Sequence, residues 1–305
     1  MIPVGIDIAK HKVDIFYQEQ HFSVENNEKA LKKCFKKLPK GSRVVMEATG
    51  KYHRLSHSLL NEMGFQVMLI NPFQSRNFAK AMNVICKTDK VDAKILALFA
   101  EKMDFVESSI ATELESDMQE MSRYLEDLKH KRVALIGQKE NTTPIVTRSI
   151  EGLIKKIEEE IKNIESKIEQ AVNEDEVQSK KMALLLTIPG VGKTTALFLL
   201  SNLRELGSLS KNQIVALSGL APRNNESGTY QGKRYVRGGR KGVRSNLFMP
   251  ILGAATQHNK RLKRFYQKLV EAGKPRKVAL TACMRKIIVW ANFMIANNLT
   301  WNSDF

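Results

Sequence analysis

A regular series of isoleucines in the middle of the chain constrains its fold more than any other feature of the sequence. The series consists of Ile150, Ile154, Ile157, Ile161, Ile164, Ile168 and Ala171. Its steps alternate between four and three residues, which is the a/d repeat of a coiled coil, and Glu and Lys fill most positions between. A helix that packs only on its own domain shows a broader apolar stripe. We therefore predict two long helices that form an antiparallel hairpin or an oligomer seam.

This helical segment divides the 305 residues into three parts. Residues 1–107 begin with three short β-rich runs and then alternate helix and strand signals, which predicts a mixed sheet flanked by helices. Residues 108–182 form the coiled-coil or oligomerisation segment, and residues 183–305 form a basic, mostly helical domain. The predicted fold class is therefore α/β in the first part and all-α in the rest.

The positive charge of the chain is concentrated in its last third. The net charge is +17, and the residues from Asn202 onward carry 19 Lys and Arg against four Asp and Glu. A cationic domain attached to a nearly neutral remainder fits a polyanionic partner such as nucleic acid. A surface that served only solubility would carry its charge scattered along the whole chain.

Cysteine usage and hydropathy indicate the compartment. Cys34, Cys86 and Cys283 are odd in number and widely spaced, which is typical of reduced thiols and not of disulfides or a zinc site. The chain does not start with the basic region of a signal peptide. Two basic residues interrupt the apolar stretch Val278–Leu299, so this stretch is a poor membrane span. We expect a cytoplasmic, nucleoid-associated protein with no membrane partner.

The motif TIPGVGKTTAL resembles the phosphate loop of ATPases but does not meet its requirements. The first glycine of such a loop would stand at position 187, which is Thr187. Apolar runs on both sides of the motif instead predict a helix-hairpin-helix. Gly190 and Gly192 permit its tight turn, and the helix that starts near Lys193 offers free N–H groups to a backbone phosphate. Such a motif would position DNA without reading its sequence; the alternative is a plain helical turn.

Four acidic residues in the first part are candidate metal ligands. Asp7 lies inside the apolar run VGIDIAK and Glu47 follows the apolar run of RVVMEATG, where a carboxylate is unfavourable unless it is paired or bound to metal. Asp89 and Asp92 are three residues apart in a helical pattern, on one face. Together they supply hard oxygen ligands for one or two Mg²⁺ ions, which can stabilise both oxygens exchanged at a phosphodiester. The alternative for any single acid is a solvated residue or a helix salt bridge.

A second cluster, rich in glycine and arginine, surrounds Ser227. The basic residues of this cluster are Arg223, Lys233, Arg234, Arg237, Arg240, Lys241 and Arg244. A serine on an exposed turn among arginines could attack phosphorus while the arginines hold the developing charge. Most serines in Ser-Gly turns only cap the turn, and Tyr230 and Tyr235 are rival nucleophiles. The arginines can bind phosphates whichever nucleophile is used.

Several motifs, in this order along the chain, resemble one known family. They are GIDIAK, MEATG, KTDKVDAKILA, TIPGVGKTTA, GLAPRNNESG, GKRYVRGGRKGVRSNLFM and GKPRKVALTACMRKII. Over nearly its full length the chain is similar to the DEDD-type insertion-sequence transposases that act as bridge-RNA-guided DNA recombinases, a group that includes the pilin-gene invertases. One departure is SNLFMPIL, where relatives have another basic residue and no proline.

The resemblance implies a fold and a mechanism. It implies an RNase H-like nuclease domain of the Holliday-junction-resolvase (RuvC) type, a coiled coil, and a C-terminal transposase domain with a catalytic serine. The family's four metal-binding acids fall on Asp7, Glu47, Asp89 and Asp92, and its serine falls on Ser227. It further implies Mg²⁺, donor and target DNA, a non-coding bridge RNA, and a dimer that assembles to a tetramer, with acids and serine from different protomers combined in one active site.

Three functions are consistent with the sequence. The favoured one is a recombinase that cleaves and rejoins DNA strands through a phosphoserine link. The alternative is a metal-dependent, structure-specific DNA nuclease with water as the nucleophile. A non-catalytic nucleic-acid-binding protein would leave Asp7 and Glu47 unexplained. Religation of the cleaved strands distinguishes the first two.

Overall fold

The computed structural model describes residues 2–50, 52–84, 88–240 and 242–302. The chain forms two compact units, Met1–Ile110 (unit 1) and Ala111–Phe305 (unit 2). Each unit has hydrophobic cores of its own, and each is described by itself.

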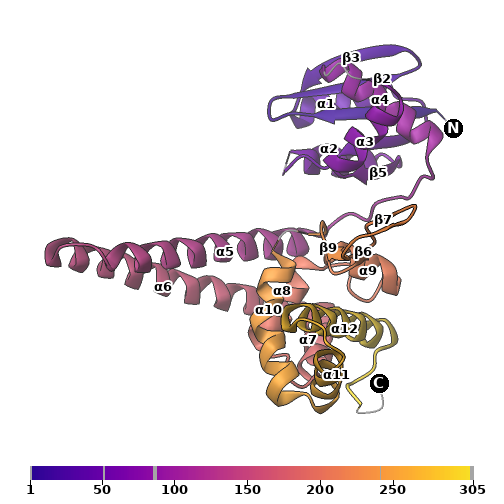
Figure 1. Ribbon diagram of the computed structural model, residues 1–305. Coiled ribbons are helices and arrows are strands. Elements are labelled where there is room, and N and C mark those ends of the chain that lie inside the picture. Colours follow the sequence, from indigo (N-terminus) through magenta and orange to yellow (C-terminus); the bar gives the residue numbers. More distant parts are fainter. Residues whose placement is uncertain (1, 51, 85–87, 241, 303–305) are drawn as a thin grey trace. The chain divides into compact units, whose positions relative to one another are not determined.

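Unit 1 contains a five-stranded mixed sheet with the strand order β3-β2-β1-β4-β5 (Figure 1). Its strands are β1 (Pro3–Ile8), β2 (Lys12–Tyr17), β3 (Gln20–Glu25), β4 (Arg43–Glu47) and β5 (Gln66–Ile70). β1 is antiparallel to β2 and parallel to β4, and β4 is parallel to β5. This arrangement confirms the predicted mixed sheet and is consistent with an RNase H-like domain.

Helices cover both faces of this sheet. They are α1 (Glu28–Phe35), α2 (His53–Glu62), α3 (Pro72–Ala81) and α4 (Asp89–Lys102). Alternate residues of β1, such as Val4 and Ile6, pack with Leu31 of α1 and Leu60 of α2. Helix α3 was not predicted from the sequence, although Asn71 caps it and Pro72 begins it.

Helix α4 packs directly on β1 because Gly5 has no side chain. A methyl group at Gly5 would overlap backbone atoms of Ala93 and Ala97 in α4. Atoms cannot interpenetrate in a close-packed interior, so only glycine permits this approach. The first turn of α4, which carries Asp89 and Asp92, is thereby held against the strand that carries Asp7.

Unit 2 is largely helical. Its α-helices are α5 (Glu113–Lys139), α6 (Pro144–Glu174), α7 (Glu176–Leu186), α8 (Lys193–Asn202), α9 (Lys211–Leu217), α10 (Val243–Gly253), α11 (Lys260–Glu271) and α12 (Arg276–Asn297). A π-helical turn, η1 (Ala254–His258), follows α10, which contains Pro250. Four two-residue strands lie between α9 and α10: β6 (Pro222–Arg223), β7 (Glu226–Ser227), β8 (Tyr230–Gln231) and β9 (Tyr235–Val236).

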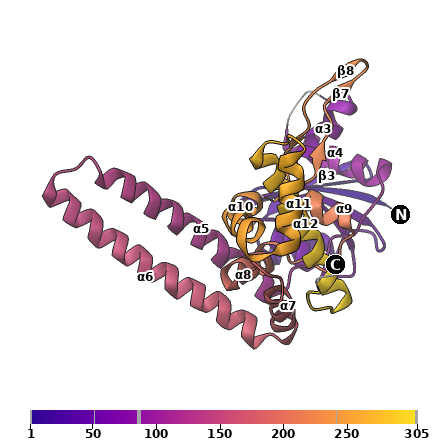
Figure 2. The ribbon, with the colours of Figure 1, turned by 60° about the horizontal axis from the view of Figure 1, so that its bottom comes forward.

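Helices α5 and α6 form a long antiparallel pair (Figure 2). Three ion pairs join the two helices: Lys129 with Glu165 at 2.9 Å, Arg132 with Glu158 at 2.9 Å, and Lys139 with Glu151 at 2.7 Å. The residue numbers rise along α5 and fall along α6, as they must in an antiparallel pair. The isoleucines of the a/d series are buried or half-buried in this unit. The antiparallel hairpin is thus present, whereas coiled-coil packing remains a prediction.

The base of this hairpin belongs to the same core as the C-terminal helices. Met118 of α5 and Ile168 of α6 pack in one cluster with Leu199 of α8 and Ile287 of α12. In the described part of the chain, α12 alone is long and apolar enough to cross a membrane, but 56% of its apolar window is buried within the unit. It therefore serves as the central core helix of unit 2. The assignment of separate roles to residues 108–182 and 183–305 stays a prediction.

Candidate active site

Asp7 and Glu47 lie on neighbouring parallel strands. The register pairs Ile6 of β1 with Met46 of β4, so the two acids follow this pair side by side. Asp7 accepts a hydrogen bond from the Ile8 N–H at 3.0 Å, and Glu47 accepts one from the Ser75 hydroxyl of α3. Two of the four predicted acids are therefore brought together by strand pairing alone.

The other two acids lie in the first turn of α4. Thr88 caps this helix through its side chain, and acidic residues are favourable at a helix N-terminus because the helix dipole is positive there. Asp89 also contacts the ammonium group of Lys12 at 3.3 Å. Because α4 packs on β1, these carboxylates face the same region of unit 1 as Asp7.

The pKa of Asp7 shows that the four acids share one electrostatic environment. Burial and then the charges of Asp92, Glu47 and Asp89 raise the pKa of Asp7 to about 6, against an opposing hydrogen bond from the N–H of Ile8. Burial disfavours a carboxylate, and nearby like charges disfavour it further. Residues that are as many as 85 positions apart in sequence thus act on one side chain.

The carboxylates are not gathered tightly enough to enclose an ion. Among the residues that the structure describes, no three Asp, Glu, His or Cys side chains form a group that could hold a metal. The donor set nevertheless fits a divalent cation, because it consists of hard oxygen ligands whose negative charge is uncompensated at Asp7.

Asp14 is a further acid of this face, which the sequence analysis missed. It lies opposite Asp7 in the β1–β2 register and is only 2% exposed. Unlike Asp7, it has two basic side chains as partners, His21 at 2.8 Å and Lys12 at 3.0 Å. The signal was present in the sequence, since KVDIFY has an aspartate inside an apolar strand just as VGIDIAK does.

Ser227 lies in unit 2, at the end of a small β-hairpin. β7 and β8 pair antiparallel, with Ser227 opposite Tyr230, and β6 pairs with β9 below them. Gly228, with φ of 56°, begins the turn between them. Both views show this hairpin extending away from the helices of unit 2 (Figures 1 and 2). Ser227 and Tyr230 are both exposed, so exposure does not choose between them as nucleophiles.

The basic residues around Ser227 fall into two groups. Arg223, Lys233 and Arg237 are exposed, and Arg234 is exposed as well, 3.7 Å from Glu226. Lys241 lies outside the described residues.

Arg240 and Arg244, in contrast, have partners inside the protein. Arg240 donates to both carboxylate oxygens of Glu205, at 2.7 and 2.9 Å, and to the Asn202 carbonyl. Arg244 donates to the Gly219 carbonyl at 2.8 Å. Although burial raises the pKa of Glu205, the bonds and charge of Arg240 outweigh it and keep that pKa below its usual value. These bonds hold the loop, and nucleic-acid binding by these two arginines stays a prediction.

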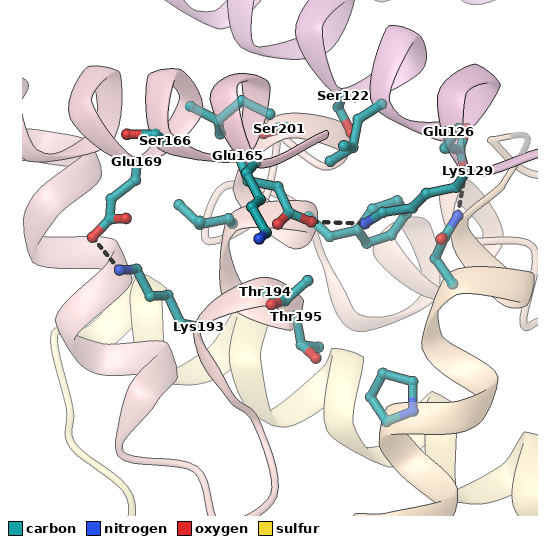
Figure 3. A pocket seen from close by; sticks show the side chains of 17 residues that line it. Ser122, Glu126, Lys129, Glu165, Ser166, Glu169, Lys193, Thr194, Thr195 and Ser201 are labelled. Carbon is teal, nitrogen blue, oxygen red and sulfur yellow. Dashed lines mark hydrogen bonds and ion pairs between the residues drawn. The ribbon is translucent and has the colours of Figure 1, made fainter. Parts of the chain in front are cut away.

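The Pro-Gly-Val-Gly turn lies between α7 and α8. Gly190 has a φ of 89° and packs closely on Ala254, whereas Gly192 is the exposed N-cap of α8. Lys193 forms an ion pair with Glu169 of α6, at the rim of a cavity of about 320 Å³ (Figure 3). The turn and its two helices are present. Their contact with DNA remains a prediction.

We expect Asp7→Asn to stabilise the metal-free protein at pH 8 and to stabilise it about half as much at pH 5. An acid whose pKa is raised from 3.8 to about 6 on folding contributes stability below 3.8, and this contribution is lost as the pH rises through 6. Because the side chain stays partly exposed, we expect about 1–2 kcal/mol at pH 8. Urea unfolding in chelator, followed by circular dichroism, measures this effect.

The matched control is Asp14→Asn, which should destabilise the protein at pH 8 because it removes the partner of Lys12 and His21. Hydrogen exchange of β1 peptides reports on unit 1 directly. If Asp7→Asn destabilised the protein as Asp14→Asn does, Asp7 would belong to the structural ion pairs and not to an uncompensated site.

We expect Arg237→Ala and Arg240→Ala to separate binding from stability. Arg237→Ala should lower the slope of log K against log salt for DNA binding by about 0.9 if it contacts one phosphate. Arg240→Ala should destabilise the protein by about 2–4 kcal/mol, because Glu205 loses its main partner while it is largely buried. A salt slope unchanged in Arg237→Ala, measured by fluorescence anisotropy, would contradict the DNA contact.

Comparison with known proteins identifies the family. The model of the DEDD-type IS110 transposases, described as a transposase, matches residues 4–143, and the model of the transposase IS116/IS110/IS902 family matches residues 182–267. The pilin gene-inverting proteins of Moraxella bovis and Moraxella lacunata are each 27% identical over 97% of this chain and 96% of their own length. The transposase for insertion sequence element IS1328 of Yersinia enterocolitica is 26% identical over 85% of this chain and 84% of its own. The chain belongs to the IS110 family of DEDD-type transposases.

Proposed function

We propose that this transposase cleaves and rejoins DNA strands through a covalent phosphoserine intermediate at Ser227, with Mg²⁺ held by Asp7, Glu47, Asp89 and Asp92. The observation that carries the proposal is the placement of these acids, because Asp7 and Glu47 lie side by side on β1 and β4, and α4 packs on β1 with the other two in its first turn. Burial and the charges of the other three acids accordingly raise the pKa of Asp7. A partly buried carboxylate among like charges lowers the stability of the fold, and such groups are typical of functional sites. The DEDD family to which the chain belongs depends on divalent metal in general.

In this proposal the four carboxylates would hold one or two Mg²⁺ ions, which supply Lewis-acid stabilisation of the oxygens that are exchanged at phosphorus. Lys12, which contacts both Asp14 and Asp89, would keep the neighbouring carboxylate of Asp14 compensated. The hydroxyl of Ser75 would orient Glu47 through its hydrogen bond. Fixing ligand orientation in this way is a common function of residues around metal sites.

Ser227 would act as the nucleophile. Its Oγ forms a bond to phosphorus, and the bond from phosphorus to a sugar oxygen breaks. The proton of the serine hydroxyl passes to the released sugar oxygen, which becomes a hydroxyl. Attack of a sugar hydroxyl on the phosphoserine then reverses these steps and frees the serine. Because one ester replaces another, the energy of the phosphodiester is conserved and religation needs no ATP. Exposed Arg223 and Arg237 would hold the phosphate charge.

The partners are also part of the proposal. Donor and target DNA would be the substrates, and a bridge RNA would guide them, as the family resemblance implies. The α7–α8 turn would act as a helix-hairpin-helix that positions a backbone phosphate. Assembly into a homo-oligomer through the α5–α6 pair is supported by apolar side chains on its surface, among them Ile145 at 80% exposure and Val133 at 66%.

The phosphoserine can be detected directly. We expect the protein, quenched in denaturant while acting on a plasmid that carries its element and flanking DNA, to retain nucleotides covalently. Trypsin should release residues 224–233 as one peptide, because Arg223 and Lys233 bound it. Fragmentation in the mass spectrometer should place the added mass on Ser227. Ser227→Ala should bind DNA as the wild type does and form neither adduct nor recombinant product.

The same peptide contains the competing hydroxyls of Thr229 and Tyr230, so Thr229→Ala and Tyr230→Phe are the controls and should keep the adduct. An adduct mapped to Tyr230, or recombination by Ser227→Ala, would make the nucleophile assignment wrong. Cleavage without any adduct would favour the metal-dependent nuclease with water as its nucleophile.

A further inference from the structure

The largest concentration of positive charge in unit 2 lies outside the regions discussed above. Between Lys260 and Lys286 the sequence has ten Lys and Arg but a single acid, Glu271. These ten make up more than half of the 19 basic residues after residue 201. The charge that first indicated a polyanionic partner therefore belongs mainly to α11 and α12, and less to the loop around Ser227.

Helix α11 separates this charge onto one side. Leu262 is fully buried, and Phe265 and Tyr266 pack against the core. Four cations on the remaining side are exposed, namely Lys260, Lys263, Arg264 and Lys268. Spacings of three, four and eight residues place side chains on a continuous strip of helix surface. In the part of the chain that the structure describes, none of these four has a carboxylate partner.

Two further cations extend the strip to the contact between α11 and α12. The helices lie side by side in both views (Figures 1 and 2). Arg261 of α11 lies over the Trp290 ring of α12, 5.5 Å from its centroid. Lys286 of α12 lies 4.5 Å from the Phe265 ring centroid and 5.3 Å from that of Trp290. Cation–π contacts with these rings hold both side chains at the contact between the two helices.

The charged side chains that act on Lys286 are mostly other cations. Burial and then Arg261 lower the pKa of Lys286, and Arg285 and Lys211 lower it further. The thiol of Cys283 acts in the opposite direction, and no carboxylate of the described residues contributes. Cations held near one another in this way repel, and binding of an anion relieves the repulsion.

We propose that the side chains of Lys260, Arg261, Lys263, Arg264, Lys268 and Lys286, here called the α11–α12 cationic surface, bind the phosphate backbone of duplex DNA. This contact is separate from the hairpin that carries Ser227. It rests on the proposed function in so far as DNA is the substrate. The surface positions the duplex and does not read its sequence, because contacts to phosphates carry no base information.

The form of the surface favours a duplex backbone. From residue 260 to residue 268 the helix rises about 12 Å, along which duplex DNA presents several phosphates. Proteins that bind single strands stack bases on free aromatic faces. Here Arg261 and Lys286 already cover faces of Trp290 and Phe265, so these rings are not available for base stacking.

The test replaces the four exposed cations of α11 by glutamine and measures DNA binding under conditions in which no strand is cleaved. The variant carries Lys260→Gln, Lys263→Gln, Arg264→Gln and Lys268→Gln. Fluorescence anisotropy with a labelled linear DNA duplex, in chelator, gives the slope of log K against log salt. Each lost phosphate contact should lower that slope by about 0.9, so we expect a reduction of about 3–4 and an affinity loss of at least about tenfold at physiological salt.

The matched control loses the same net charge elsewhere. It carries Lys29→Gln, Lys33→Gln, Lys36→Gln and Lys37→Gln at or just after α1, where all four lysines are exposed. It should keep a slope close to that of the wild type. A third variant, Lys260→Arg with Lys263→Arg and Lys268→Arg, keeps the charge and should keep the binding. Circular dichroism confirms that each variant is folded.

Three results would overturn the proposal. The first is a wild-type slope in the neutralised variant. The second is an equal loss in the α1 control, which would show only the effect of net charge. The third is a variant that loses binding to an RNA duplex but retains binding to DNA, which would make this an RNA site. The binding assay needs neither metal nor Ser227. A missing phosphoserine adduct would therefore not affect the proposal that the α11–α12 cationic surface binds DNA, and an unchanged salt slope would not affect the proposed phosphoserine mechanism.

Discussion

The close approach of α4 to β1 at Gly5 is the constraint on which the candidate active site depends. Without it, the first turn of α4 could not lie against the strand that carries Asp7, since any larger side chain would meet the helix backbone. The contact joins two segments about 85 residues apart in sequence. It is therefore a steric feature of the fold, and not the acids themselves, that turns four separate carboxylates into one electrostatic site.

How much of this site the sequence could predict depends on the range of the interaction. Asp7 and Glu47 are recognisable because each is a charge at an apolar strand, which is a local pattern. The equivalent pattern at Asp14 differs only in its partners. Lys12 precedes it by two residues on the same strand, whereas the β2–β3 pairing brings His21 to it. Helix α3 was missed although Asn71 and Pro72 signal its start, because its segment has a weak apolar pattern.

The basic residues show the same limit more clearly. A sequence counts charges but does not show which of them are compensated. Arg240 is a candidate phosphate ligand by its sequence, but Glu205, on another segment, accepts two of its hydrogen bonds. The reverse is true of Lys286, whose neighbours in space are cations. Burial and ion pairing are properties of the fold. They distinguish the arginines and lysines of unit 2 that are paired inside the protein from those that are exposed, which composition cannot do.

We infer that the four acids of unit 1 form one divalent-cation site, in which the carboxylate of Asp7 lies among like charges. The most direct measurement is the affinity for Mn²⁺, used in place of Mg²⁺, determined from the electron paramagnetic resonance signal of the free ion between pH 5 and pH 8. Mn²⁺ prefers the same oxygen ligands. We expect the affinity to fall as the pH decreases through about 6, where Asp7 takes up a proton, and we expect Asp7→Asn to bind Mn²⁺ weakly at every pH. Binding that is independent of pH and equal in Asp7→Asn would show that these acids do not form the site.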